Sequence, residues 1–164
     1  MLIGGATFSA DRRYRYRLWR RWDRSRPVVL FVMLNPSTAD ALEDDPTIRR
    51  CIGFARDWGF GGIEVVNLFA MRATDPRELD RANDPVGQDN GRYLHRALLR
   101  STLIVLAWGA HGSLRDRAAA TRRVVSRRRP RCLGLTRSGE PRHPLYLRRD
   151  ARLVLVRSAR RSAA

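Results

Sequence analysis

The order of hydrophobic and polar positions along the chain predicts alternating strands and helices. Large and charged residues alternate from Tyr14 to Trp22. This period of two is typical of a half-buried strand, which we expect to pair antiparallel with Ala6 to Ser9 or with the next strand. Val28 to Leu34 is apolar throughout, as in a strand buried on both faces. Three later runs predict further core strands: Ile63 to Leu68, Leu103 to Ala107, and about Cys132 to Leu135.

Helical signals separate these predicted strands. Asp45 and Pro46 have the features of an N-cap and a first helical position, and apolar residues follow with helical spacing as far as Trp58. Gly59 to Gly62 then end this helix. The remaining predicted elements are a helix from Asn83 or Asp84 through Leu99, a helix from Leu114 to about Arg127, and an edge strand at Leu153 to Val156.

Strands that alternate with helices favour parallel pairing through right-handed crossovers. We therefore expect an α/β fold: a three-layer sandwich with a four-stranded parallel central sheet and an N-terminal antiparallel hairpin. The length predicts a single α/β domain over residues 1–164, with the hairpin in 1–26, the core in 27–150 and a basic tail in 151–164. Ligands bind beyond the carboxyl ends of such strands. The segments at that edge are 35–40, 67–74, 108–112 and 136–146.

The charge is unevenly distributed. The chain has 33 basic and 16 acidic residues, for a net charge of +17, and all 33 are arginine, which suggests a G+C-rich coding bias. Residues 11–26 sum to +6 and residues 115–164 to +13, whereas residues 27–114 sum to −2. Two basic flanks around a slightly acidic centre suit a protein that binds a polyanion at its margins, and the polyanion we expect is DNA, single- or double-stranded. An arginine-rich solvated surface is the alternative.

Composition also excludes several classes of protein. The longest apolar run, Val28 to Leu34, is much shorter than the roughly 20 residues of a membrane-spanning helix, and no secretory signal begins the sequence. Cys51 and Cys132 are too few for an iron-sulfur cluster or a structural zinc site. The three histidines are far apart, so we expect no metal and no cofactor. A reducing cytoplasm is the expected compartment.

Two asparagines at the expected sheet edge are candidate functional residues. Pro36 fixes the backbone after Asn35, whose amide then either orients a water or ligand or caps its own turn. Asn67 ends an otherwise apolar strand, so its amide must find partners. Those partners are either the edge of an amide-like base or a neighbouring loop.

The other two segments at this edge also carry candidate chemistry. Gly109 permits close approach of a ligand, and Trp108 is expected to pack beneath the site. His111 lies either at the site or on the surface. His143, in a loop fixed by two prolines, either donates a hydrogen bond to a leaving group or is simply exposed.

Several long stretches resemble one bacterial family. These stretches are Arg13 to Leu18, Met33 to Asp40, Asp45 to Arg50, Asn67 to Ala70, Asp84 to Gly87, Trp108-Gly109 and Arg142 to Tyr146. From Phe8 to Tyr146 the chain is identified by them as a member of domain-of-unknown-function family 1643 (DUF1643). That family implies no activity.

The order of the site segments also resembles, more distantly, the uracil-DNA glycosylase superfamily. Asn35-Pro36-Ser37 is similar to the Asn-Pro-Gly motif of its mismatch-specific branch, and Asn67 matches its base-recognising asparagine. Trp108-Gly109 is similar to the end of its third strand, and Arg142 to Tyr146 matches the His-Pro of its last motif. The chain departs from the superfamily at the Asn35 position, which has no catalytic aspartate, and in the rest of the last motif.

This resemblance implies a DNA base-excising N-glycosylase that hydrolyses the N-glycosidic bond of a damaged or modified base, as in DNA repair. The implied roles are catalysis for Asn35 and His143; substrate binding for Asn67, Pro36, Ser37, Trp108 and Gly109; and DNA binding for Arg142, Leu145, Tyr146, Arg49 and Arg50. The alternatives are a hydrolase of free nucleosides or nucleotides and a non-catalytic nucleic-acid-binding protein.

Overall fold

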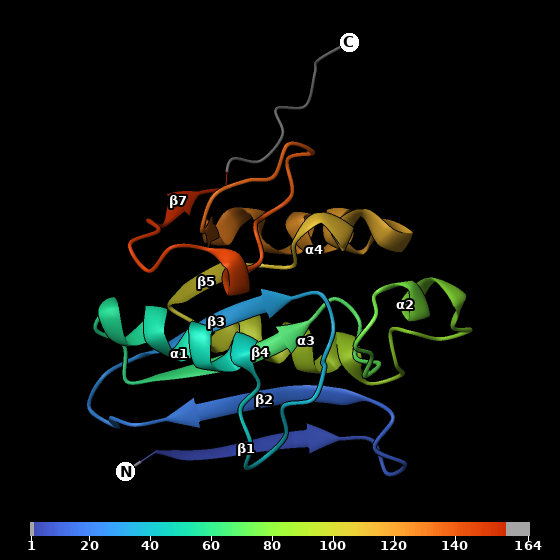
Figure 1. Cartoon of the computed structure of the whole chain (residues 1–164), viewed down its shortest axis with the longest axis horizontal. Helices are drawn as coiled ribbons and strands as arrows, with labels where there is room; N and C mark the ends of the chain where they lie inside the picture. The colour runs from blue at the N-terminus through green and yellow to red at the C-terminus, as the bar shows by residue number, and fades with distance from the viewer. Residues whose placement is uncertain (1, 157–164) are drawn as a thin grey trace.

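The computed structural model describes residues 2–156 and shows one mixed sheet with helices on both faces (Figure 1). Its strands are β1 (Ile3–Phe8), β2 (Arg15–Arg21), β3 (Val28–Met33), β4 (Gly62–Asn67), β5 (Leu103–Leu106), β6 (Arg131–Cys132) and β7 (Val154–Leu155). Its helices are α1 (Pro46–Asp57), α2 (Arg77–Arg81), α3 (Asn90–Arg100) and α4 (Arg117–Val125). Short 3-10 segments are η1 (Ala110–Asp116), η2 (Ser126–Arg128) and η3 (Pro144–Tyr146).

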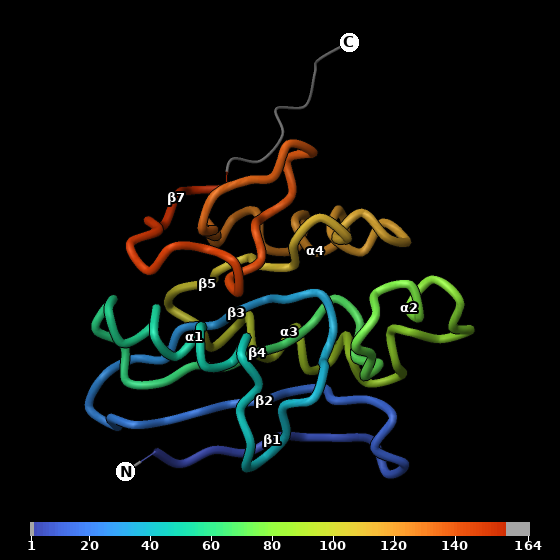
Figure 2. Tube along the Cα trace, in the orientation of Figure 1, coloured from blue at the N-terminus to red at the C-terminus, as the bar shows by residue number. Residues whose placement is uncertain are grey.

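The sheet has seven strands in the order β1-β2-β4-β3-β5-β6-β7, with β1 and β7 at opposite edges (Figure 2). The inner strands β4, β3, β5 and β6 pair in parallel, so that Phe31 lies between Val65 and Val105. The β1-β2 hairpin continues this sheet, because β2 pairs antiparallel with β4 and sets Leu18 opposite Val65. The four expected core strands thus form the inner, parallel part of a larger mixed sheet of seven strands. The hairpin covers the backbone groups that β4 would otherwise leave unpaired.

Helices cover both faces of the sheet because the central strands are apolar on both sides. Leu30 and neighbouring residues pack against Leu98 of α3 and other residues of α2 and α4. Phe31, which points to the opposite face, packs in the same cluster as Ile52 of α1. In Figure 1, α1 lies in front of β3 and β4, and α3 lies behind them.

The start of α1 confirms the sequence prediction. Asp45 is the N-cap, its side chain accepts a hydrogen bond of 2.8 Å from the Ile48 N–H, and Pro46 occupies the first turn. The helix ends at Asp57, close to the predicted boundary.

The helix predicted from Asn83 or Asp84 is wrong in its start. Asp84 Oδ1 accepts hydrogen bonds from the Val86 and Gly87 N–H groups and stabilises a turn. Helix α3 therefore begins only at Asn90. The short helix α2, Arg77–Arg81, was not predicted.

The C-terminal elements are shorter than predicted. The expected helix from Leu114 is interrupted because Arg115 and Asp116 have φ values of +49° and +56°, so α4 begins at Arg117. Strand β6 ends at Cys132, and Leu135 instead forms a bridge with Pro141. Within the expected edge strand at 153–156, Val154–Leu155 forms β7, which pairs antiparallel with β6. Residues 157–164 of the predicted basic tail lie outside the described residues.

Candidate functional site

A cleft of about 710 Å³ opens beyond the carboxyl ends of β3, β4 and β5. We call it the carboxyl-edge cleft. The four segments predicted to meet at this edge all contribute residues to it. The predicted site residues that line it are Asn35, Ser37, Asn67, Trp108, Gly109, Arg142, His143, Leu145 and Tyr146.

Asn35 is half-buried, and one end of its amide is held by the protein. Nδ2 donates to the carbonyl oxygens of Ala73 at 2.7 Å and Pro36 at 2.9 Å. The side chain thus bonds to its own segment at Pro36, as the turn considered above requires, and also links that segment to the loop of Ala73. Within residues 2–156, no donor contacts Asn35 Oδ1. The oxygen is therefore available to a water or a ligand.

Asn67 ends β4 and is only 2% exposed. Its main-chain oxygen accepts a hydrogen bond of 3.1 Å from the side chain of Asn90. Its own side-chain amide makes no hydrogen bond with any described residue, so the alternative of a bond to a neighbouring loop is not realised. Neither atom of this amide is among the side-chain atoms that are buried without a partner, so the amide is open to the cleft. A ligand in the cleft can therefore pair with it.

Trp108 is a fixed wall of the cleft. The indole is 1% exposed, and its Nε1 donates to Glu140 Oε2 at 2.5 Å. Arg122 holds the same carboxylate at 2.8 Å, with its guanidinium 5.5 Å from the indole centroid. Gly112 lies so close that a Cβ there would be 2.1 Å from Trp108 Cδ1. These contacts prevent the ring from rotating into the cleft.

Gly109 brings the end of β5 against the loop that carries His143. Its φ is +78°, and an added Cβ would lie 3.2 Å from His143 Cβ. Its N–H donates to the Pro141 carbonyl at 2.8 Å. A side chain at this position would therefore be strained and would push His143 away.

His143 is half-buried at the start of η3, and its Nδ1 accepts from the Leu145 N–H at 3.4 Å. Burial lowers the pKa of His143, and the Asp45 carboxylate partly offsets this effect. The ring is therefore neutral at pH 7. With Nδ1 as acceptor, its proton resides on Nε2, which makes no hydrogen bond with residues 2–156 and can donate to a ligand.

Two charged residues of the cleft were missed as site residues. Asp45 lines it, although the sequence indicated only a helix cap. Its sequence position could have indicated this, because it precedes a predicted helix whose first turn faces the carboxyl ends of the strands. Arg15 lines the cleft and is 3% exposed, although alternation in its strand predicted a solvent-facing charge. The alternation misled because β2 lies inside the sheet and the segment around Ala39 and Asp40 covers it, with Arg15 Nη1 donating to Ala39 O at 2.6 Å.

Three predicted residues do not line the cleft: Pro36, Arg49 and Arg50. The Pro36 carbonyl instead accepts the Ala73 N–H at 2.9 Å. Arg49 bonds to the Asp44 carbonyl, and Arg50 bonds to the Leu147 carbonyl. Helical geometry explains this, because Ile48 and Cys51 turn the apolar face of α1 inward and leave these arginines on other faces.

The rim of the cleft is formed by side chains of η3 and of the loop before it. Tyr146 is 87% exposed, Leu145 is half-buried and Arg142 is exposed. His111, on η1, is exposed and also lines the cleft. An exposed aromatic residue beside an arginine at the rim suits contact with a nucleic acid.

Part of the N-terminal basic flank is used within the fold. Arg17 pairs with Glu64 at 2.6 Å, and Arg20 pairs with Asp44 at 2.8 Å. Arg21 donates to two main-chain carbonyls of the following loop. Residues 11–26 therefore offer less free positive charge to a partner than their sum of +6 suggests.

Other kinds of site find little support in the described part of the chain. Over residues 2–156, no three His, Cys, Asp or Glu side chains form a group that could hold a metal ion. No helix in that range is long and apolar enough to cross a membrane. Burial raises the pKa of both thiols, Cys51 and Cys132, which makes them poor nucleophiles.

Comparison with known proteins identifies a family. The model of a family described as "Protein of unknown function (DUF1643)" matches residues 15–145, well over half of the chain. The matched range includes Arg15, Asp45 and every predicted site residue except Tyr146. No curated protein and no solved structure matches the chain.

Proposed function

We propose that this chain, which belongs to the DUF1643 family, hydrolyses the N-glycosidic bond between a damaged or modified base and its sugar in DNA. One observation carries the proposal. The carboxyl-edge cleft gathers an amide at Asn67 that no residue of 2–156 pairs with, an open acceptor at Asn35 and a neutral imidazole donor at His143. Base recognition, water placement and leaving-group stabilisation need these three kinds of group.

Asn67 is the proposed base-recognising residue. An amide presents a donor and an acceptor side by side, as the edge of a nucleobase does. The Asn67 amide is pre-positioned by β4 and lies in a cleft walled by Trp108. A base that pairs with it replaces hydrogen bonds that the folded protein lacks.

Glycosidic cleavage develops positive charge on the sugar and negative charge on the departing base. Asn35 Oδ1 holds the attacking water, whose oxygen bonds to the anomeric carbon. The Asp45 carboxylate stabilises the positive sugar and accepts the proton that this water releases. Asp45 thereby supplies the negative charge that the Asn35 position lacks. The base leaves with the electron pair of the broken bond.

His143 acts on the departing base. Its Nε2–H donates to a base oxygen on which negative charge accumulates, a hydrogen bond that strengthens as the bond breaks. A neutral imidazole is sufficient for this role, because the acceptor provides the charge. The lowered pKa of His143 keeps the ring in that form at neutral pH.

In duplex DNA the base must leave the stack to enter the cleft. Tyr146 and Leu145, which lie at the rim, are the residues proposed to fill the vacated space, and Arg142 is the residue proposed to contact a phosphate. The order of these segments along the sheet supports a relation to the uracil-DNA glycosylase superfamily and its fold. A bacterial cytoplasm is the proposed compartment.

The direct test is single-turnover incubation with a panel of oligonucleotides, each with one modified base, scored for abasic sites. Asp45→Asn is the sharpest variant, because asparagine preserves the N-cap while removing the charge. Glu43→Gln is its control, since Glu43 is exposed and its side chain makes no hydrogen bond with a described residue. We expect excision by wild type and Glu43→Gln and its loss in Asp45→Asn. No excision of any base would refute the proposal.

The same panel separates the other two functions. Release of bases from free nucleosides or nucleotides, without excision from oligonucleotides, would identify a small-molecule hydrolase. Oligonucleotide binding without release of any base would identify a non-catalytic binding protein. Binding to DNA should weaken steeply as salt rises, because arginine–phosphate contacts release counterions.

A further inference from the structure

Arg15 is a buried cation with an incomplete set of partners. It lies on β2, lines the carboxyl-edge cleft and is 3% exposed. Nη1 donates to the Ala39 carbonyl at 2.6 Å. Nε is buried without an acceptor, and among residues 2–156 nothing accepts a hydrogen bond from Nη2. Nη2 is not among the fully buried orphan atoms, so it remains accessible from the cleft.

Arg20, on the same strand, is a buried arginine whose hydrogen-bonding groups all have partners, and it serves as a comparison for Arg15. It is 2% exposed and reaches the same segment of the chain. Nε donates to Asp44 at 2.8 Å, Nη1 donates to Trp19 O at 2.9 Å, and Nη2 donates to Asp40 O at 2.7 Å. All three nitrogens have acceptors, and the charge has a carboxylate beside it. Arg15 lacks both.

No carboxylate in the described residues lies within 4.0 Å of the Arg15 guanidinium. Asp40 and Asp45 act on it only from a distance, and one oxygen of each is already occupied by main-chain N–H groups. Burial lowers the pKa of Arg15 to about 10, so the group keeps its charge at neutral pH. A buried charge of this kind is costly unless an anion is supplied from elsewhere.

We propose that Arg15 binds a phosphate group of the ligand inside the carboxyl-edge cleft. A guanidinium is the side chain best suited to an oxyanion, and Nη2 is the donor it has free. The anion site is inferred from Arg15 alone, whereas its assignment to the phosphate of a nucleotide unit rests on the proposed function. The cleft then takes a base at Asn67 and a phosphate at Arg15 from one ligand.

The first test uses inorganic phosphate and requires no turnover. Titration calorimetry, with sodium chloride matching the ionic strength, should give saturable binding to wild type. Arg15→Gln should weaken this binding about tenfold or more, as expected for a hydrogen bond to a charged group. The control is Arg149→Gln, at an exposed arginine outside the cleft, which should leave the affinity unchanged. Equal affinity in wild type and both variants would show diffuse binding to the basic surface and would overturn the inference.

Arg15→Lys covers the case in which Arg15→Gln does not fold. Lysine keeps the positive charge but replaces the planar, forked guanidinium with a compact ammonium group. The expected result is a folded protein that binds phosphate more weakly. Unchanged affinity would overturn the inference. If neither variant folds, absence of saturable phosphate binding to wild type still refutes it.

The second test identifies the source of the phosphate. Three kinds of ligand are compared for binding to wild type and Arg15→Gln: nucleosides, their 5′-monophosphates, and short oligonucleotides in which one nucleotide flanks the test nucleotide on each side. If the phosphate raises the affinity of wild type but not of Arg15→Gln, the inference is supported. The source of the phosphate is then whichever binds more tightly, the free monophosphate or the oligonucleotide. Nucleosides that bind as tightly as nucleotides would overturn the phosphate site and leave the glycosylase proposal standing. Conversely, if no base is excised but the phosphate still raises the affinity through Arg15, the glycosylase proposal is overturned and the phosphate site stands.

Discussion

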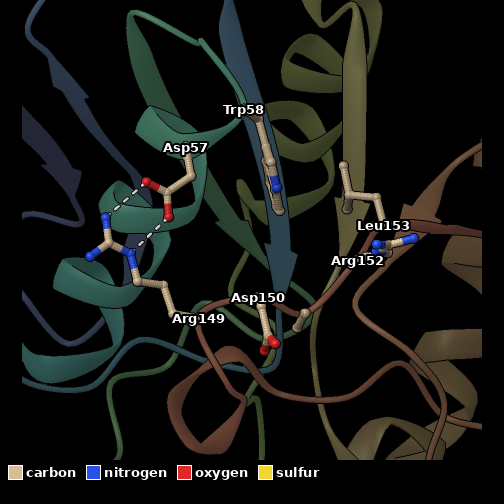
Figure 3. A pocket seen from close by; sticks show the side chains of 7 residues that line it. Asp57, Trp58, Arg149, Asp150, Arg152 and Leu153 are labelled. Carbon is tan, nitrogen blue, oxygen red and sulfur yellow. Dashed lines mark hydrogen bonds and ion pairs between the residues drawn. The ribbon is translucent and has the colours of Figure 1, made fainter.

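Two hollows of similar size lie in different parts of the molecule and differ in how their charges are satisfied. One is the carboxyl-edge cleft of about 710 Å³. The other, about 610 Å³, lies beside the end of α1 and is lined by Asp57, Trp58 and residues 149–153. Figure 3 shows this second hollow, where Arg149 makes two hydrogen bonds of 3.1 Å to the carboxylate of Asp57.

The difference shows that volume alone does not identify a site. In the hollow beside α1, the most prominent charges neutralise one another, and no polar group there is buried without a partner among the described residues. In the carboxyl-edge cleft, Arg15 Nε is buried without a partner, and the Asn67 amide, Asn35 Oδ1 and Arg15 Nη2 open into the cleft without a protein partner in the described range. Polar groups that a fold encloses in a cleft and leaves unpaired favour a ligand.

Among the substitutions that test this difference between the two hollows, the one at Asp45 should have the largest effect on excision. Asp45→Asn should lower single-turnover excision by about a hundredfold to ten-thousandfold, because it removes the proposed proton acceptor. The melting temperature should stay close to that of wild type, since the N-cap is preserved. A variant with normal excision would remove Asp45 from the mechanism.

His143→Ala should lower excision by about a hundredfold, the usual cost of removing one donor to a developing oxyanion. His95→Ala, at an exposed position on α3, is the matched control. Oligonucleotide affinity should change little in either variant. A loss of binding without a change in the bound-state rate would assign His143 to recognition instead.

The same histidine predicts a pH dependence of stability. Because burial lowers the pKa of His143 in the folded state, protonation favours unfolding. The stability that the neutral ring contributes is present above the ordinary histidine pKa of about 6.5 and is lost as pH falls below it. Urea unfolding at several pH values should show a shallower acid slope in His143→Ala than in wild type. Identical slopes would contradict the burial effect.

A smaller effect is expected at Asn67, on selectivity. Asn67→Ala should reduce discrimination between the preferred base and others by about tenfold to a hundredfold, the worth of one paired amide. Asn67→Asp should change the preferred base, because a carboxylate accepts hydrogen bonds but does not donate them. Excision ratios across the oligonucleotide panel measure both effects. An unchanged ranking in both variants would mean that another group recognises the base.

The smallest effect is expected in the second hollow. Asp57→Asn breaks an exposed ion pair, so neither the melting temperature nor excision should change measurably. Impaired excision in this variant, with stability unchanged, would show that the hollow beside α1 takes part in function and would remove the contrast between the two regions.

Sequence patterns predicted those parts of the structure that depend on residues close together in the sequence. The apolar run of β3, the Asp45 cap and the polar segments after the strands follow from the sequence because each signal is short-range. The burial of Arg15 does not, since it requires β2 to pair with β4, about 45 positions further along the chain. The start of α3 was missed for another reason. Asp84 forms a turn, although its neighbours fit a helical pattern.

The wide separation in sequence of the residues that line the cleft has a consequence for biosynthesis. The cleft draws on Arg15 near one end of the chain and on residues up to Leu147 near the other. A ribosome delivers these segments in order, and domains of this size complete their tertiary packing only when the necessary segments have emerged. The nascent chain can thus form the β1-β2 hairpin first, whereas β3 must wait for its partners β4 and β5, and the cleft closes only after η3 has been synthesised. A truncated translation product that ends before His143 would carry the recognising amide of Asn67 without the histidine, and so would be unable to complete the proposed reaction.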